Sequence, residues 1–161
     1  MIYYDIFKAF DDRGLDYVVI GGVALVMHGA VRLTADLDLM VALDTENLRK
    51  LVEIMGRLKY LPRIPEPAEA LLDPVKRQEW RERKHMEVFS FYAPDQPLAL
   101  IDIMIREPVD YVTLRANAVS MRLHGLPVPV ASLDDLIALK RQAGRPQDLE
   151  DIRALEELRR G

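Results

Sequence analysis

The sequence contains no cysteine among its 161 residues. A disulfide scaffold, a thiolate zinc site and a cysteine nucleophile are therefore excluded. The composition fits a reducing compartment, and we expect a cytoplasmic protein. No apolar run approaches the ~20 residues that a membrane span requires, and residues 1–10 lack the apolar stretch of a targeting signal. We therefore expect no contact with a membrane.

Positive charge is also scarce, because 22 lysines and arginines face 26 aspartates and glutamates, for a net charge of −4. This balance argues against a protein that coats nucleic acid through bulk positive charge. Any binding of phosphate groups must then depend on a few residues at one site. Hydrophobic residues make up 50% of the chain, which excludes a chain that is disordered for lack of apolar surface.

The length predicts a single domain over residues 1–161, and the periodicity predicts an α/β fold with a mixed sheet flanked by helices. We expect an α/β core over 1–131 and C-terminal helices over 132–161 that pack on it. The first helical pattern begins at Ile2. Further helices are expected at 23–28, 45–58, 75–84, 110–118, 133–142 and 146–158, and strands at 17–20, 37–41, 87–92, 98–105, 119–123 and 128–130, with a loop and a short helical piece at 62–74.

Two aspartates flank the first residue of the strand expected at 37–41. In an extended chain Asp36 and Asp38 point the same way, with Cα atoms roughly 6–7 Å apart. Both can then reach one divalent cation, or two cations about 3.5–4 Å apart. Mg²⁺ favours sites in which carboxylates share the ion with water and substrate phosphate oxygens. The alternative is an exposed strand edge that carries acids by chance.

Two other features favour the same chemistry. Gly21-Gly22 lies between a buried strand and a helix start, where backbone N–H groups attract anions and the lack of a Cβ admits a triphosphate; an ordinary βα turn is the alternative. Asp102 lies inside the apolar run 100–105, where an unpaired carboxylate is costly to bury. Metal coordination would compensate this cost, and so would a salt bridge to an arginine.

These residues together resemble a known superfamily. Gly21-Gly22, thirteen intervening residues, Asp36-Leu37-Asp38 and the later strand acid Asp102 are similar to the polymerase-β-like nucleotidyltransferases. The string GGVALVMHGAVRLTADLDLMV most resembles the minimal and AbiEii-type bacterial members, which include toxin–antitoxin proteins. Gly22 departs from the broad pattern, in which many members have a serine whose hydroxyl could contact phosphate.

The C-terminal string SLDDLIALKRQAGRPQDLEDI also resembles the AbiEii-type members, with Lys140, Arg145, Asp148 and Asp151 at matching places. Lys140 is expected to reach the nucleotide. Whether Arg145, Asp148 and Asp151 serve the reaction or fix the tail stays open, although an Arg145 pairing with one of the two acids is the favoured reading.

The resemblance implies a polymerase-β-like nucleotidyltransferase fold and the Mg²⁺-dependent transfer of a nucleoside monophosphate from an NTP, such as ATP, to an acceptor hydroxyl. It implies two Mg²⁺ ions held with the NTP by Asp36, Asp38 and Asp102, the last also helping to deprotonate the acceptor. The residues implied in phosphate binding are Gly21, Gly22, Arg32, Thr34 and Lys140.

The identity of the acceptor is not encoded in any pattern, and a protein, a tRNA end or a small molecule all fit the chemistry. Arg77, Arg81, Arg83 and Lys84 form either a solvated helix face or a basic edge for a tRNA. A second function hypothesis is a binding module that holds a cognate toxin or antitoxin partner, because the chain is short. The three acids favour the enzyme, since a binding module has no need of converging carboxylates.

Overall fold

One mixed sheet organises the computed structural model, which describes residues 3–161. Its strand order is β3-β4-β5-β2-β1-β7-β6, with β1–β7 and β2–β5 parallel and the other neighbours antiparallel. The strands are β1 (Tyr17–Ile20), β2 (Leu37–Val41), β3 (Leu61–Pro62), β4 (Val88–Ala93), β5 (Gln96–Met104), β6 (Val119–Leu123) and β7 (Leu126–Val130).

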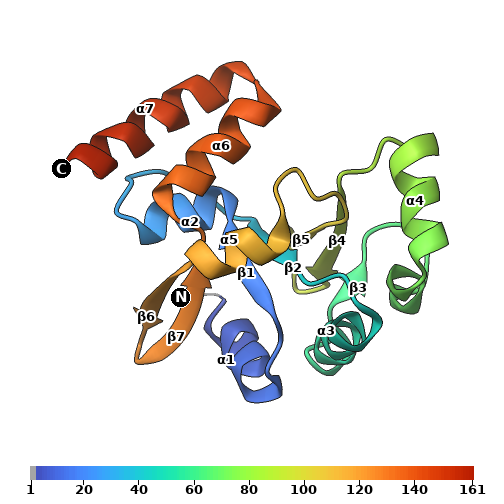
Figure 1. Cartoon of the computed structure of the whole chain (residues 1–161). Coiled ribbons are helices and arrows are strands. Elements are labelled where there is room, and N and C mark those ends of the chain that lie inside the picture. Colours follow the sequence, from blue (N-terminus) through green and yellow to red (C-terminus); the bar gives the residue numbers. More distant parts are fainter. Residues whose placement is uncertain (1–2) are drawn as a thin grey trace.

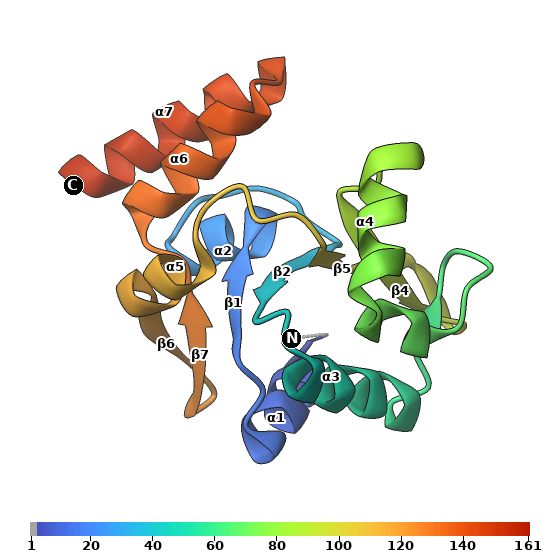
Figure 2. The ribbon, with the colours of Figure 1, turned by 45° about the vertical axis from the view of Figure 1, so that its right-hand side comes forward.

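Helices surround the sheet, which confirms the predicted α/β class with a mixed sheet. Figures 1 and 2 show α1 and α3 on one side of the molecule and α6 and α7 on the opposite side, with β1 and β2 between them. The helices are α1 (Tyr4–Arg13), α2 (Gly21–Met27), α3 (Thr45–Arg57), the 3₁₀ helix η1 (Ala68–Leu72), α4 (Pro74–Arg83), α5 (Tyr111–Asn117), α6 (Leu133–Ala143) and α7 (Pro146–Arg160).

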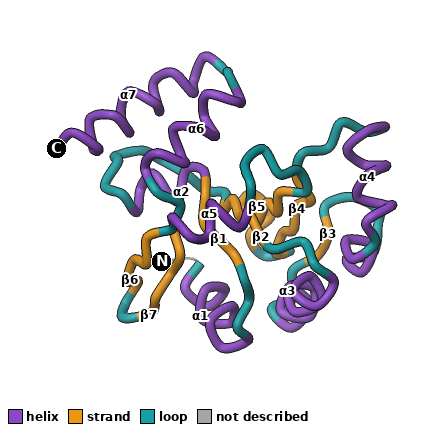
Figure 3. Tube along the Cα trace, viewed as in Figure 1, coloured by secondary structure: helices purple, strands orange, loops and turns teal. Residues whose placement is uncertain are grey.

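Local chemistry explains where these elements begin and end. The four residues of β1 are all buried, as expected for an apolar strand with strands on both sides. Asp44 caps α3 by accepting a hydrogen bond from the Asn47 backbone at 2.9 Å. Gly14 ends α1 with a left-handed φ of 64°, a conformation that costs glycine no Cβ clash. The tube in Figure 3 shows how short the connections between elements are along most of the chain.

Three expectations about the fold need correction or lie outside the described residues. Ile2 is outside the described part. Leu61–Pro62 forms β3 against β4, although the sequence indicated a loop from Pro62 onward and no strand before it. The sequence also predicts a capping box at Ser132 and Asp135 for the helix at 133–142. The Ser132 side chain does accept from the Asp135 backbone at 3.1 Å, but the Asp135 carboxylate accepts from Asn117 at 3.4 Å, so the reciprocal half of the box is not formed.

Apolar side chains from both sides of the sheet fill the core. Trp80 of α4 is 1% exposed and packs on Phe89, with ring centroids 5.2 Å apart. Within residues 3–161, no helix combines the length and the apolar composition needed to cross a membrane. The core positions the ends of β1, β2 and β5, where the candidate site lies.

Candidate active site

Strand register brings two of the predicted acids side by side. Asp38 of β2 lies opposite Asp102 of the parallel strand β5. Burial, followed by repulsion from the Asp102 carboxylate, raises the pKa of Asp38 to about 7. Burial also raises the pKa of Asp102. The structure therefore holds two acids that repel one another at neutral pH, in surroundings that favour a compensating cation.

The third predicted acid, Asp36, precedes β2 and is fastened to β5. Its Oδ1 accepts a hydrogen bond from the Leu100 backbone at 3.1 Å, and its charge raises the pKa of both Asp38 and Asp102. All three acids thus lie within electrostatic range of one another. Tyr3 lies beside the segment that carries Asp36, because its hydroxyl donates to the Ala35 carbonyl. Burial, followed by the charge of Asp36, raises the pKa of its phenol to about 12.

Ser90 completes the surroundings of Asp102 and was not foreseen. It lies on β4 opposite Asp102, and its hydroxyl donates to Asp102 Oδ1 at 2.5 Å. In the described part of the chain Asp102 forms no ion pair, and Arg63 acts on its pKa only as a weaker, longer-range influence. The arginine salt bridge considered as an alternative is therefore not formed. The alternation Phe89-Ser90-Phe91, placed in the hairpin register, is the signal that could have identified Ser90.

Gly21 is required by Asp38. A Cβ added to Gly21 would lie 2.2 Å from Asp38 Oδ2 and 2.9 Å from Asp38 Cβ, and the residue has a left-handed φ of 69°. Ile20 immediately before it pairs with Asp38 across β1 and β2. The glycine therefore allows the carboxylate to lie directly against the backbone at the start of α2.

Gly22 has a comparable relation to Thr34. A Cβ on Gly22 would lie 2.7 Å from Thr34 Oγ1, so the threonine hydroxyl occupies the space beside the glycine. Thr34 belongs to the segment that leads into Asp36, and its hydroxyl lies 3.4 Å from the Asp36 carbonyl oxygen. The structure thus brings Gly21, Gly22 and Thr34 together with the acids Asp36 and Asp38.

The two predicted cations meet at one carboxylate. Asp151 of α7 pairs with Arg32 at 2.8 Å and with Lys140 of α6 at 2.9 Å. Lys140 also lies 3.4 Å from Asp148, and its charge lowers the pKa of Asp38. Asp151 therefore joins the C-terminal helices to the segment that carries Thr34 and the first acid.

Asp148 fixes the start of α7. It is fully buried and accepts hydrogen bonds from the Arg145 backbone at 2.9 Å and from Arg145 Nε at 3.0 Å. Burial raises its pKa, but the hydrogen bonds from Arg145 and the charge of Lys140 outweigh burial and hold that pKa below its ordinary value. The Arg145–Asp148 pairing is the structural arrangement that the sequence favoured.

Replacing Asp148 by alanine is expected to lower the free energy of unfolding by about 2–4 kcal/mol, because it leaves Lys140 and the first turn of α7 without their buried acceptor. The change is measured by denaturant unfolding at neutral pH. Glu150→Ala is the matched control, since this acid lies exposed on the same helix. An equal, small effect of both changes would contradict the structural role of Asp148.

His28 at the end of α2 and the basic run of α4 make contacts that fix their structural roles. His28 caps the end of α2, and its Nε2 lies 2.8 Å from the Ala131 carbonyl oxygen, as expected for a helix-end residue. In the basic run of α4, Arg77 is only 7% exposed and donates to the Leu71 carbonyl at 2.6 Å. The run is therefore neither a uniformly solvated face nor a continuous basic edge.

The acids of the site match the small number of protein ligands that Mg²⁺ requires. Within residues 3–161, no three acid or histidine side chains gather closely enough to hold a metal ion alone. Mg²⁺ commonly binds through only one or two carboxylates, with water and substrate phosphates as its other ligands. The Asp38–Asp102 pair supplies hard oxygen donors of that number and charge. The residues therefore fit an ion that arrives with a nucleotide better than a metal cage made by the protein alone.

The sequence of the chain matches the model of a known protein family. The model described as "Nucleotidyl transferase AbiEii toxin, Type IV TA system" matches residues 5–160. The chain belongs to the AbiEii nucleotidyltransferase family. This match confirms the resemblance drawn from the glycine and aspartate motifs, and it identifies the chain as a nucleotidyltransferase enzyme. A search of curated proteins returned no match.

Solved structures share the fold of this AbiEii-family chain. The crystal structure of ANT(2″)-Ia in complex with adenylyl-2″-tobramycin is 19% identical, covers 98% of this chain and 91% of that chain, and has a TM-score of 0.64. The lincosamide antibiotic adenylyltransferase LnuA, lincomycin-bound, is 14% identical over 98% and 95%, with a TM-score of 0.61. A putative nucleotidyltransferase from Thermotoga maritima is 16% identical over 94% and 88%, with a TM-score of 0.60. At these identities the likeness establishes the fold, and it confirms the predicted polymerase-β-like nucleotidyltransferase architecture of the AbiEii-family chain.

Proposed function

We propose that this chain transfers a nucleoside monophosphate from an NTP to an acceptor hydroxyl and releases pyrophosphate. The observation that carries the proposal is the pairing of Asp38 with Asp102 in register on adjacent parallel strands. Two partly buried carboxylates that repel one another are costly to the fold. Their presence side by side on two interior strands of the sheet, with a third acid in range, is explained by a function that needs them.

Asp36, Asp38 and Asp102 are the proposed ligands of a divalent cation, most suitably Mg²⁺. When bound, the ion would neutralise the negative charge of the triphosphate and the charge that develops during transfer. The Ser90 hydroxyl fixes the orientation of Asp102, which leaves the second oxygen of that carboxylate for the ion or for the proton of the acceptor. The close approach of Asp38 to Gly21 fixes the other carboxylate.

Phosphate oxygens are the proposed partners of three side chains and of the glycine backbone. Thr34 lies against Gly22, and the charge of Lys140 acts on Asp38. Arg32, which Asp151 links to Lys140, is the third candidate. Asp151 acts as a positioning residue, because it holds Arg32 and Lys140 in fixed places before the nucleotide binds. Preorganised side chains reduce the entropy lost on binding.

Asp151→Asn is expected to raise the KM for the NTP about tenfold, with kcat within about twofold of wild type, because both cations lose their common anchor. Steady-state kinetics over a range of NTP concentrations measure this split. Glu150→Gln, an exposed neighbour on α7, should leave both parameters unchanged. An unchanged KM for Asp151→Asn, or a loss confined to kcat, would contradict the positioning role.

A labelling experiment identifies the class of the acceptor, and a growth experiment tests the biological setting. The protein is incubated with Mg²⁺ and each α-³²P-labelled NTP in a host lysate. The labelled product is then classified as RNA, protein or small molecule by its sensitivity to ribonuclease and to protease.

We propose that the enzyme acts in the cytoplasm as the toxin of a type IV toxin–antitoxin pair, in line with the description of its family. Induced expression should then arrest growth, and Asp38→Asn should remove both the arrest and the labelling. Growth arrest or partner binding that persists in this variant would instead support the binding-module hypothesis.

A further inference from the structure

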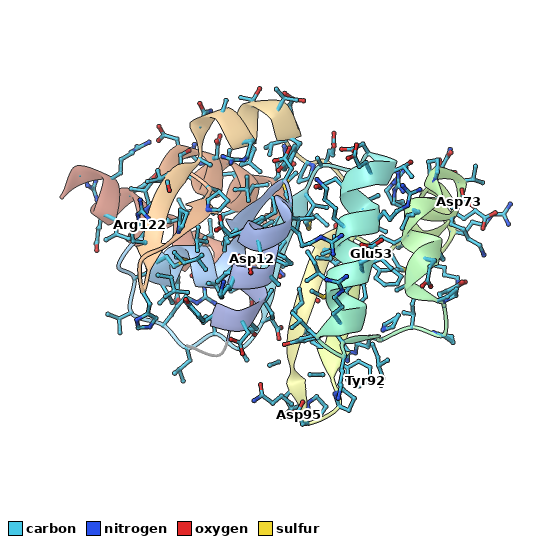
Figure 4. The ribbon with its side chains drawn as sticks, turned by 90° about the horizontal axis from the view of Figure 1, so that it is seen from below. Asp12, Glu53, Asp73, Tyr92, Asp95 and Arg122 are labelled. Carbon is cyan, nitrogen blue, oxygen red and sulfur yellow. The ribbon has the colours of Figure 1, made fainter. Side chains whose placement is uncertain are left out.

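A separate cavity lined by arginines lies where β2 and β5 end. It has a volume of about 400 Å³ and is lined by Leu43, which follows β2, by Ile105, which follows β5, and by Arg77 of α4. Asp36 precedes β2, so the whole length of that strand separates it from the cavity. In Figure 4, Asp73 marks the start of α4, and Glu53 marks the neighbouring helix α3. The cavity is therefore distinct from the candidate active site.

Arg77 contributes a buried charge that no carboxylate neutralises. The side chain is 7% exposed, and its guanidinium donates only to backbone carbonyls, at 2.6 Å to Leu71 and 3.4 Å to Leu43. Burial, followed by repulsion from Arg81, lowers the pKa of Arg77, and Asp73 offsets only part of this. A buried charge without a counter-ion is costly, and two hydrogen bonds leave part of the five-donor fork free.

Two further arginines line the same cavity. Arg81, one turn along α4, donates to the Ile105 carbonyl at 2.9 Å and forms no ion pair within the described residues. Arg106 pairs with Glu87 at 3.1 Å in an exposed position. Glu107 is the acid among the lining residues. Three guanidinium groups thus line the cavity beside a single lining carboxylate, while two further acids act from outside the lining, Glu87 on Arg106 and Asp73 on Arg77.

We propose that this cavity binds the phosphate group of a small anion, with Arg77, Arg81 and Arg106 as its ligands. Guanidinium groups match phosphate geometry through paired N–H donors. The volume is within the range of small-ligand sites and accommodates orthophosphate, pyrophosphate or the phosphate end of a nucleotide. The bound anion supplies the counter-charge that Arg77 lacks. Ile105 lies three residues beyond Asp102, roughly 10 Å along the strand, but none of the three acids of the candidate active site lines the cavity.

Calorimetric titration of the full chain tests this site. The chain is titrated in EDTA at constant ionic strength with orthophosphate, pyrophosphate and ATP as separate ligands, and EDTA removes the divalent cation that the active site requires. Arg81→Gln and Arg106→Gln should each weaken binding about tenfold, which is the loss of one charge-assisted contact. Arg83→Gln removes the same charge from an exposed position of the same helix, and it should change the affinity less than twofold. Arg81 and Arg106 are used because the buried Arg77 is also part of the fold.

The outcomes of the titration either support or overturn the proposed anion site. Binding of orthophosphate or pyrophosphate that is lost in Arg81→Gln and Arg106→Gln but kept in Arg83→Gln supports the site, and the order of affinities identifies the anion. Failure of wild type to bind any of the three, or equal losses in all three variants, would overturn it. Binding that is weakened only by Lys140→Gln would assign the anion to the candidate active site and would also overturn the proposal.

Discussion

Asp38→Asn should reduce nucleotidyl transfer by about 10³-fold or more while leaving the fold intact. Amide oxygen is a weaker ligand than carboxylate, and the change removes one of two converging charges from the Asp38–Asp102 pair. The loss of a metal-directed charge in the transition state is worth several kcal/mol. Rates are measured as the appearance of labelled acceptor. Asp95→Asn, at the tip of the β4–β5 hairpin (Figure 4), is the control and should retain full activity.

The same substitution should stabilise the metal-free protein at about pH 8. The folded-state pKa of Asp38 is raised from 3.8 to about 7, whereas the unfolded chain keeps the ordinary value. Between about pH 4 and pH 7 the folded carboxyl binds a proton that the unfolded one has released, so the free energy of unfolding falls as the pH rises. Above this window the full cost remains, on the order of a few kcal/mol.

Thermal unfolding of wild type and Asp38→Asn in EDTA measures this effect. The advantage of the variant should be largest near pH 8 and should vanish only below about pH 3, where the Asp38 carboxyl is protonated in both states of wild type. A variant that is inactive and also less stable at both pH values would indicate a structural role for Asp38. A stabilised, inactive variant is the behaviour of a residue retained for function at a cost to the fold.

Gly21→Ala is expected to have the second-largest effect, with transfer reduced about 10²-fold or more because misplacement of a catalytic group by about 1 Å is enough for such a loss. The added Cβ would overlap Asp38 Oδ2 at 2.2 Å, so the carboxylate must move. Gly14→Ala is a close control. Its φ of 64° matches the 69° of Gly21, but nothing lies within 4 Å of an added Cβ.

Both glycine variants should lose about 1 kcal/mol of stability from the left-handed backbone. Only Gly21→Ala should lose activity beyond what its stability explains. Kinetics and unfolding are measured on both proteins below the onset of unfolding. Similar activities in the two variants would show that the contact between Gly21 and Asp38 is unimportant for the reaction.

Much of the site could be predicted because its signals are local. The run Tyr17–Ile20 is apolar throughout, so β1 and the glycines that follow it were recognisable. Asp102 stood out as an acid inside an apolar run, and strand pairing then brought it beside Asp38. The roles assigned to these residues remain predictions.

The features that were missed depend on contacts between distant segments. Ser90 becomes a partner of Asp102 only once β4 and β5 are in register. Arg77 lies in a strongly polar helix, yet packing against the segments that hold Leu43 and Leu71 buries it. The short strand β3 forms because β4 offers an edge to Leu61–Pro62. In each case tertiary structure overrides the local pattern.

Nucleotidyl transfer at the Asp38–Asp102 pair is tested most directly by comparing two positions of the label in one NTP. Wild type is incubated with Mg²⁺, the acceptor-containing lysate and either α-³²P or γ-³²P NTP, beside Asp102→Asn under the same conditions. Wild type should transfer the α label to the acceptor and release the γ label as pyrophosphate. Asp102→Asn should do neither. Transfer of the γ label to the acceptor, or undiminished α transfer by Asp102→Asn, would contradict nucleotidyl transfer at this pair.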